Sequence, residues 1–246
     1  MSFDRAFSLA RYNWPLYLTC FLGVALGFII WKTQLVPPPI RYLGLLAAVV
    51  ATWYTIASFV AFHVMFDHSD FLSGEWLTRC VEQSPNTCVQ LSVCVEETTL
   101  PISKVFASAD YIELDLFDES VMTEPAIARA KQKAGDSPSI VAKPEALPLT
   151  DHTSELTVVT LAAHEVRDPS QREALFQELS RITAPGGRLI IVEHIRNLPA
   201  AAVFGPGLFH FYPRTTWTTL AQKTKLRIES EFDITPFFHV FVLRHG

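Results

Sequence analysis

The sequence predicts an α/β domain, built on a mainly parallel sheet with helices on both faces and preceded by a hairpin of two transmembrane helices. Three observations carry this prediction. Two long apolar runs without charge lie near the N-terminus, strand-like and helix-like segments alternate after residue 70, and 246 residues suit one domain plus a short module. We therefore expect a hairpin over residues 1–69 and an α/β domain over residues 70–246.

The hairpin is predicted from two apolar runs. Residues 14–31 form a run of about 18 uncharged residues, enough to span a hydrocarbon core as a helix, with a tryptophan at each end to suit the two interfaces. Residues 37–39 are three prolines, which are expected to break the helix. Residues 42–66 form a second run of about 25 residues. Such a hairpin places both of its ends on the same side of a lipid bilayer.

The orientation of the hairpin is predicted from its flanking basic residues. Arg5, Arg11 and Arg79 lie on the side of the two ends, against Lys32 and Arg41 in the turn. The positive-inside rule favours the side with the larger count, which places the ends and the α/β domain in the cytoplasm.

One histidine lies near the end of the second span. His63 is followed one turn later by Asp67 and His68. An ionisable group in a membrane span is a functional candidate, and a histidine there could ligate a haem or a pigment. The alternative is a histidine at the membrane interface that is hydrogen-bonded to its neighbours. The alternative is favoured because the first span carries no partner histidine.

The segments of the α/β domain follow from their periodicity and composition. Strands are expected at residues 89–93, 111–114, 140–142, 156–161 and 188–192, with a closing antiparallel pair at 226–233 and 238–243. Helices are expected at residues 124–133, 169–182 and 215–223. Asp168 before Pro169 is interpreted as a helix-start device. The Pro-Gly-Gly sequence at residues 185–187 is expected to make a tight turn into the strand that follows it.

Composition narrows the function classes. A net charge of −5 without any basic run argues against a nucleic-acid partner. Cys80, Cys88 and Cys94 lack the paired C-x-x-C spacing of a zinc site, and the fourth cysteine, Cys20, lies in the first span. We therefore expect no metal, and we interpret the cysteines as buried, reduced thiols.

The stretch at residues 156–194 resembles the class I S-adenosylmethionine-dependent methyltransferases. The similarity rests on residues 162–168, on the Pro-Gly-Gly turn between a helix and a strand, and on the Glu193-His194 pair that ends this strand. It is greatest to the small-molecule branch that includes quinone-methylating enzymes, and it covers most of residues 88–244. The resemblance implies a Rossmann-like sheet whose last strand runs antiparallel, and S-adenosylmethionine as the cofactor.

The resemblance also implies positions for the cofactor. Asp115 matches the acid that holds the ribose hydroxyls, a role for which a carboxylate is suited as a double acceptor. The alternative is that Asp115 caps the segment that follows it. The acid expected near the adenine falls on Lys143, which reverses the charge.

The glycine-rich loop of the family falls on residues 91–98, inside a stretch from Gly74 to Gly135 that has no glycine between its ends. The usual acid becomes Ser92, and the glycines become Cys94, Glu96 and Thr98. Side chains at these positions would crowd the methionine end of the cofactor, because glycine is what lets a backbone approach a ligand closely.

Two residues are candidates for catalysis. His164 matches a position at the end of the fourth strand, near the substrate entrance, and the pKa of histidine suits a general base. Glu193 ends the next strand, where open α/β sheets bind ligands. The alternative for both is a role in supporting loops.

The segment at residues 198–213 is apolar and aromatic, and the resemblance implies that it helps to form the acceptor pocket. The alternative is that it docks on the hairpin or lies at the lipid surface.

Our main interpretation is a membrane-anchored methyltransferase acting on a lipophilic quinone, isoprenoid, pigment or lipid. The alternative is an inactive methyltransferase fold that serves as a scaffold or subunit of a membrane complex. The lost glycines and Lys143 favour the second interpretation, and the retained acids Asp115 and Glu193 favour the first.

Overall fold

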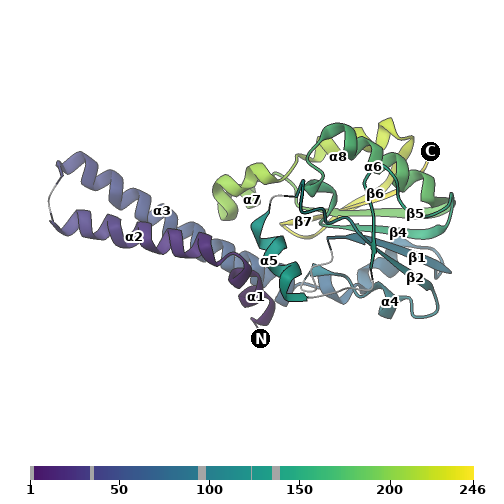
Figure 1. Cartoon of the computed structure of the whole chain (residues 1–246), viewed down its shortest axis with the longest axis horizontal. Helices are drawn as coiled ribbons and strands as arrows, with labels where there is room; N and C mark the ends of the chain where they lie inside the picture. Colours follow the sequence, from purple (N-terminus) through teal and green to yellow (C-terminus); the bar gives the residue numbers. More distant parts are fainter. Residues whose placement is uncertain (1–2, 34–35, 94–97, 123, 135–138) are drawn as a thin grey trace.

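The computed structural model describes residues 3–33, 36–93, 98–122, 124–134 and 139–246. A long helical hairpin projects from one end of an α/β domain, as Figure 1 shows. The N-terminus lies near the base of the hairpin, and the C-terminus lies on the domain away from the hairpin.

The hairpin consists of α2 (Trp14–Thr33) and α3 (Pro38–Phe62), and a short helix, α1 (Asp4–Tyr12), precedes it. The prolines begin the second helix, because Pro37 is its N-cap and the next two occupy first-turn positions that need no intrahelical N–H donor. The two helices pack closely where Gly27 faces Gly44, since a Cβ added at Gly27 would lie 3.2 Å from the carbonyl oxygen of Gly44. Both helices are long and apolar enough to cross a membrane, by length and composition.

The base of the hairpin is tied together by one carboxylate. A π-helical turn, His63–His68, continues α3. Its Asp67 accepts hydrogen bonds from the backbone N–H groups of Arg5 and Ala6, both at 3.1 Å, which satisfies donors at the start of α1. His63 lies 3.3 Å from the same carboxylate, and its ring stacks on that of Phe3. These contacts match the alternative of a histidine that is hydrogen-bonded to its neighbours.

The domain contains the predicted seven-stranded sheet, in the order β3-β2-β1-β4-β5-β7-β6. The first five strands pair in parallel, whereas β7 is antiparallel to both β5 and β6. The strands are β1 (Thr87–Ser92), β2 (Asp110–Asp115), β3 (Ile140–Val141), β4 (Ser154–Thr160), β5 (Thr183–Glu193), β6 (Leu226–Thr235) and β7 (Phe238–His245). The strand order reverses between β1 and β4, which is where folds of this kind bind ligands. The predicted fold class is confirmed.

Helices cover both faces of the sheet, with α6 and α8 on one side and α4 on the other (Figure 1). Asp168 caps α6 as predicted, because its carboxylate accepts from the backbone N–H groups of Ser170 and Gln171 at 2.8 and 3.0 Å. The helices of the domain are α4 (Ile102–Val105), α5 (Pro125–Ala134), α6 (Pro169–Ile182), α7 (Leu198–Phe204) and α8 (Arg214–Lys223).

The hairpin and the domain share one hydrophobic core. Phe66 at the base of the hairpin packs edge-on against Phe238 of β7, with ring centroids 5.3 Å apart. Phe71, in the connection to the domain, packs against both rings, at centroid distances of 6.0 Å from Phe66 and 4.4 Å from Phe238. All three side chains are buried. The core therefore runs across the predicted boundary at residue 69.

The sequence predicts a tight turn at Pro-Gly-Gly before the strand, and this prediction is wrong. These residues lie inside β5 as a bulge, because Ser154 pairs with Thr183 and Leu156 pairs with Arg188, so that four residues face Glu155 alone. Gly187 is buried against this partner, and an added Cβ would lie 2.7 Å from the carbonyl oxygen of Glu155. Gly186 has no atom within 4 Å of an added Cβ.

These two glycines give a matched test of the bulge. We expect Gly187→Ala to lower the free energy of unfolding by about 1–3 kcal/mol, because the new methyl group meets backbone that cannot move aside. Gly186→Ala should change it by less than about 0.5 kcal/mol. Denaturant unfolding in detergent micelles, followed by tryptophan fluorescence, measures both. Equal effects of the two changes would contradict this packing.

Candidate functional site

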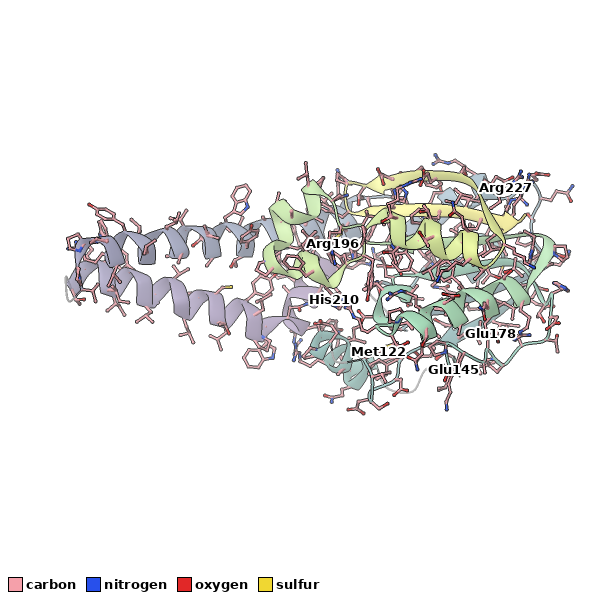
Figure 2. The ribbon with its side chains drawn as sticks, turned by 90° about the horizontal axis from the view of Figure 1, so that it is seen from above. Met122, Glu145, Glu178, Arg196, His210 and Arg227 are labelled. Atoms are coloured by element: carbon pink, nitrogen blue, oxygen red, sulfur yellow. The ribbon has the colours of Figure 1, made fainter. Side chains whose placement is uncertain are left out.

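Charged and aromatic side chains gather at the carboxyl ends of β4 and β5. His164 and Glu165 lie on a 3-10 turn, Ala163–Glu165, directly after β4, and Glu193 ends β5. His210 comes from a second 3-10 segment, Gly205–His210, which follows α7. Because parallel strands end at one edge of the sheet, these residues meet although they are distant in sequence. Figure 2 shows His210 at the end of the domain that is nearer the hairpin.

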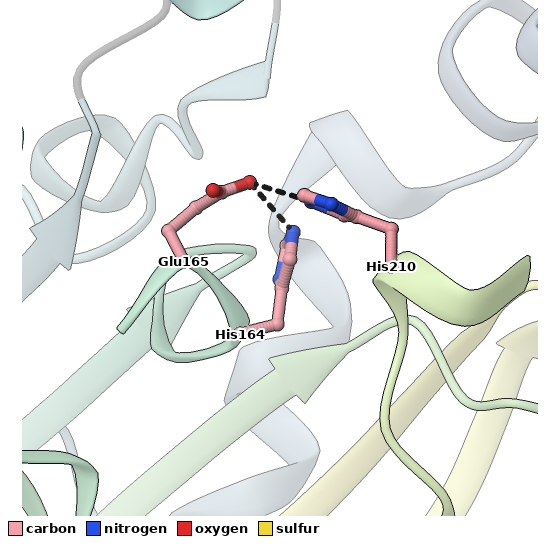
Figure 3. A group of neighbouring side chains, drawn as sticks. All are labelled: His164, Glu165 and His210. Carbon is pink, nitrogen blue, oxygen red and sulfur yellow. Dashed lines mark hydrogen bonds and ion pairs between the residues drawn. The ribbon is translucent and has the colours of Figure 1, made fainter. Parts of the chain in front are cut away.

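The side chain of His164 lies between two carboxylates. Its Nδ1 atom is 2.6 Å from Oε2 of Glu193, and its backbone N–H donates to Oε1 of the same residue at 3.2 Å. Its Nε2 atom is 3.1 Å from Oε1 of Glu165, and this oxygen also lies 2.9 Å from Nε2 of His210 (Figure 3). The structure thus brings the two predicted catalytic residues, His164 and Glu193, into direct contact.

These contacts set the charges of the group. Burial alone would lower the pKa of His164, but the charge of Glu193 and hydrogen bonds to both carboxylates raise it to about 10. Burial would raise the pKa of Glu165, yet hydrogen bonds from His164 and His210 hold it well below its usual range. At neutral pH His164 is therefore an imidazolium, and Glu165 stays ionised.

A second histidine beside this group has the opposite charge state. The Nδ1 atom of His194 lies 3.0 Å from the carbonyl oxygen of Phe237, so Nδ1 carries the proton and Nε2 carries the lone pair. Its ring stacks on Phe211 at a centroid distance of 4.5 Å. Burial among these rings, together with the positive charge of His164, lowers the pKa of His194 to about 3.

A cavity of about 200 Å³ lies over this edge of the sheet. Its floor includes the side chains of His164, Glu165 and His194 from the domain. Its opposite wall comes from the hairpin and the helix before it, which contribute Tyr12 and Phe66 among others. The α/β domain alone would leave this cavity open on that side.

A second cavity, of about 300 Å³, lies beyond the ends of β2 and β3. It has apolar walls at Leu116, Met122 and Ala142, and Lys143 lies on its rim. Glu165 lines this cavity as well as the first, so the two adjoin. Met122 lies on the hairpin side of Glu145 along this edge in Figure 2.

The predicted ribose ligand, Asp115, is 8% exposed at the end of β2. One of its oxygens accepts from the backbone N–H of Phe117 at 2.9 Å, and the other forms an ion pair with Lys131 of α5. The first contact is the capping role that the sequence analysis gave as the alternative. A carboxylate can accept about four hydrogen bonds, so both oxygens retain capacity for hydroxyl donors.

The other predicted cofactor residues lie at different places. Ser92 is buried at the end of β1, directly opposite Asp115 in the register of the sheet. Lys143 is exposed and lies at the second cavity. Cys94 and Glu96 fall outside the described residues. The cofactor roles of all five stay predictions.

The cluster of His164, Glu165 and His210 has the donor types of a metal site, and its ligand atoms lie within 4.8 Å of one another. The neighbouring Arg167 argues against a cation there. Its guanidinium contacts Nδ1 of His210, lies 2.7 Å from Nε2, and donates to the carbonyl oxygen of the same residue. Because a guanidinium only donates and is always charged, it takes the place of the positive charge that a metal would bring. We interpret the cluster as a network of paired charges, and the absence of a metal stays a prediction.

Sequence reasoning placed only part of this site. Glu165 and His194 directly follow the candidates His164 and Glu193, and their position at strand ends is the signal that identifies them. His210 has no local signal, because the chain brings it back from 46 residues after His164. The wall formed by the hairpin is likewise invisible in any local pattern.

The strand order and the strand-end site define a class I methyltransferase-type domain. Residues 90–191 match the family model described as a methyltransferase domain, which confirms the predicted resemblance. The chain is also 29% identical over 118 residues to the ubiquinone/menaquinone biosynthesis C-methyltransferase UbiE of Syntrophotalea carbinolica. This match covers 48% of the chain and 46% of the relative, so the chain spans about half the length of that protein.

Solved structures show the same fold. A SAM dependent methyltransferase from Aquifex aeolicus aligns with a TM-score of 0.54 at 15% identity, over 74% of this chain and 91% of the other. The PH0226 protein from Pyrococcus horikoshii OT3 aligns with a TM-score of 0.52, also at 15% identity, over 72% and 89%. The methyltransferase domain implies S-adenosylmethionine as the cofactor.

The ion pair of His164 and Glu193 predicts how the stability of the fold changes with pH. An unfolded histidine titrates near 6.5, so the raised pKa of His164 stabilises the fold fully below pH 6.5 and loses this effect as pH rises through about 10. We expect the wild type to lose stability between these values, and His164→Gln to lack this slope. At pH 6 the variant should be less stable by about 3–5 kcal/mol, because it leaves a buried carboxylate unpaired.

Denaturant unfolding in detergent micelles at a series of pH values measures both effects. The double variant His164→Gln, Glu193→Gln should recover part of the loss, since neither charge is then left alone. Parallel pH profiles for the wild type and His164→Gln would show that the pair does not set the stability of this edge.

Proposed function

We propose that this protein is a membrane-anchored S-adenosylmethionine-dependent methyltransferase that acts on a lipophilic small molecule. One observation carries the proposal. The cavity over the site has titratable side chains on the domain side and apolar side chains of the hairpin region on the other. A pocket built in this way suits a molecule with a reactive polar head and an apolar body.

The described residues fit the cofactor. The cavity of about 300 Å³ has the apolar walls that an adenine ring needs, and Asp115 lies on the adjoining strand with capacity to accept ribose hydroxyls. Ser92, opposite Asp115, and Lys143 on the rim are the further predicted contacts. S-adenosylmethionine supplies a methyl group on a positively charged sulfur. The residues of this chain position the acceptor against it and exclude water, which is where most of the acceleration of such a transfer arises.

His164 and His194 have different roles in acid–base chemistry. Their environments move the pKa values apart, to about 10 for His164 and about 3 for His194. Such a separation distinguishes an acid from a base in a site. The imidazolium of His164, held by Glu193, stabilises negative charge on the acceptor. Nε2 of His194 has its lone pair available, so it accepts a hydrogen bond from the hydroxyl, amine or acidic carbon that is methylated.

Membrane anchoring is supported by α2 and α3, which are long and apolar and bury few of their residues in the protein. We place the domain on the cytoplasmic side, following the flanking basic residues. The relationship to a quinone methyltransferase supports a lipophilic acceptor. The alternative of an inactive scaffold in a membrane complex rests on the lost glycines and on Lys143 in place of an acid. Most of that loop, residues 94–97, lies outside the described residues, and no described contact favours the alternative.

Calorimetric titration of the detergent-purified protein with S-adenosylmethionine tests the proposal. We expect a micromolar dissociation constant for the wild type. For Asp115→Asn we expect a constant roughly a hundredfold higher, because charge-assisted hydrogen bonds to two hydroxyls are lost.

Asp151→Asn is the matched control, since it removes an exposed carboxylate that pairs with Arg181 away from the site. It should bind as the wild type does. Binding by the wild type that Asp115→Asn leaves unchanged would refute the ribose role, and absence of binding at millimolar ligand would refute the proposed function.

A further inference from the structure

A third cavity, largely apolar and of about 470 Å³, lies between the hairpin and the segment after β5. The first turns of α2 form one wall, with Leu16, Tyr17 and Cys20. The last turns of α3 form another, and α7 with the 3-10 segment that follows it closes the third side. We call this cavity the hairpin groove.

The hairpin groove adjoins the cavity over the site. The two share four lining residues, Asn13, Phe62, Glu124 and Phe211. Phe211 also stacks on His194, so the shared wall reaches the titratable side chains directly. A single elongated molecule can therefore occupy both spaces.

The walls of the groove are fixed by specific contacts. The indole N–H of Trp53 on α3 donates to the carbonyl oxygen of Ala202 on α7 at 2.8 Å. The ring of Tyr54 packs on Gly205, where an added Cβ would lie 3.0 Å from the ring. Gly205 also has a φ of 50°, a conformation that side chains disfavour. The hairpin and α7 are thus held at a set separation with the groove between them.

The lining of the groove suits a hydrocarbon chain. Among the described residues that line it, Glu124 at the shared end is the one charged side chain. The hydroxyls of Tyr17 and Ser58 lie 3.3 Å apart and pair with each other. From Asn13 to Cys20 the groove follows α2 for about 10 Å at 1.5 Å per residue. This stretch lies inside the first candidate membrane span apart from its first residue.

We propose that the hairpin groove binds the hydrocarbon tail of the acceptor and admits it sideways from the bilayer, while the head of the acceptor lies in the cavity over the site. This inference rests on the proposed function and adds to it a tail-binding site and a route of entry. Leu198 and Phe209, in the segment that closes the third side, are 86% and 73% exposed. These apolar side chains suit a position at the lipid surface.

Two quinol probes that share a head and differ in their tail test the proposal: 2-decylhydroquinone and 2-methylhydroquinone. Ala51→Phe places a ring inside the groove, whereas Ala47→Phe, one turn earlier on α3, adds the same ring at an exposed position outside it. In nanodiscs we expect Ala51→Phe to raise KM for the decyl probe at least roughly tenfold. A tenfold change corresponds to the loss of burial of about two methylene groups of the tail. KM for the methyl probe should stay unchanged, and Ala47→Phe should affect neither probe.

The outcomes separate the two proposals. If the wild type methylates both probes and Ala51→Phe changes KM equally for the two, the tail site is overturned and the proposed function stands. If the wild type methylates neither probe, a binding measurement decides. A decylhydroquinone with a diazirine at the end of its chain should then label residues 13–20 and 51–62 saturably, in competition with unlabelled 2-decylhydroquinone. Labelling of these residues that the competitor does not reduce would overturn the tail site.

Discussion

The buried carboxylate of Glu193 is the constraint on which the site depends. It is fully shielded from water at the end of β5, where an unpaired charge would carry a large desolvation cost. The imidazolium of His164 compensates it, and this fixes the turn after β4 against the end of β5. Burial lowers the pKa of His194, and the positive charge held on His164 lowers it further, so the two neighbouring histidines have opposite charge states.

The second organising feature is the aromatic joint between the hairpin and the sheet. Phe66, Phe71 and Phe238 join the end of α3 to β7, and Trp53 ties the middle of α3 to α7. A helix pair that is fixed at two places serves as a wall of the site. The cavity over the site therefore belongs to both parts of the chain, and it forms where the carboxyl edge of the sheet faces the base of the hairpin.

Local signals in the sequence were sufficient for most strands, for the two apolar helices of the hairpin and for α6. The bounds of α6 and its Asp168 cap follow from periodicity and capping chemistry. Non-local pairing decided the rest. The Pro-Gly-Gly sequence carries a strong turn signal, but its pairing with Glu155 on β4 absorbs it into β5 as a bulge. His164 and Glu193 could be brought together from sequence, because adjacent parallel strands end at one edge. Lys131 against Asp115, and the hairpin as a wall, depend on how helices dock, and no pattern in the chain encodes that directly.

The carboxylate of Asp67 has a consequence for the order in which the molecule is assembled. It caps the first turn of α1, a helix of 9 residues that has no side-chain cap of its own. A helix this short is marginal in water when nothing stabilises it from outside. During synthesis α1 leaves the ribosome before its cap, which follows about sixty residues later, after both helices of the hairpin have been made. The helix that lines the cavity over the site is therefore capped only after the whole hairpin has been made.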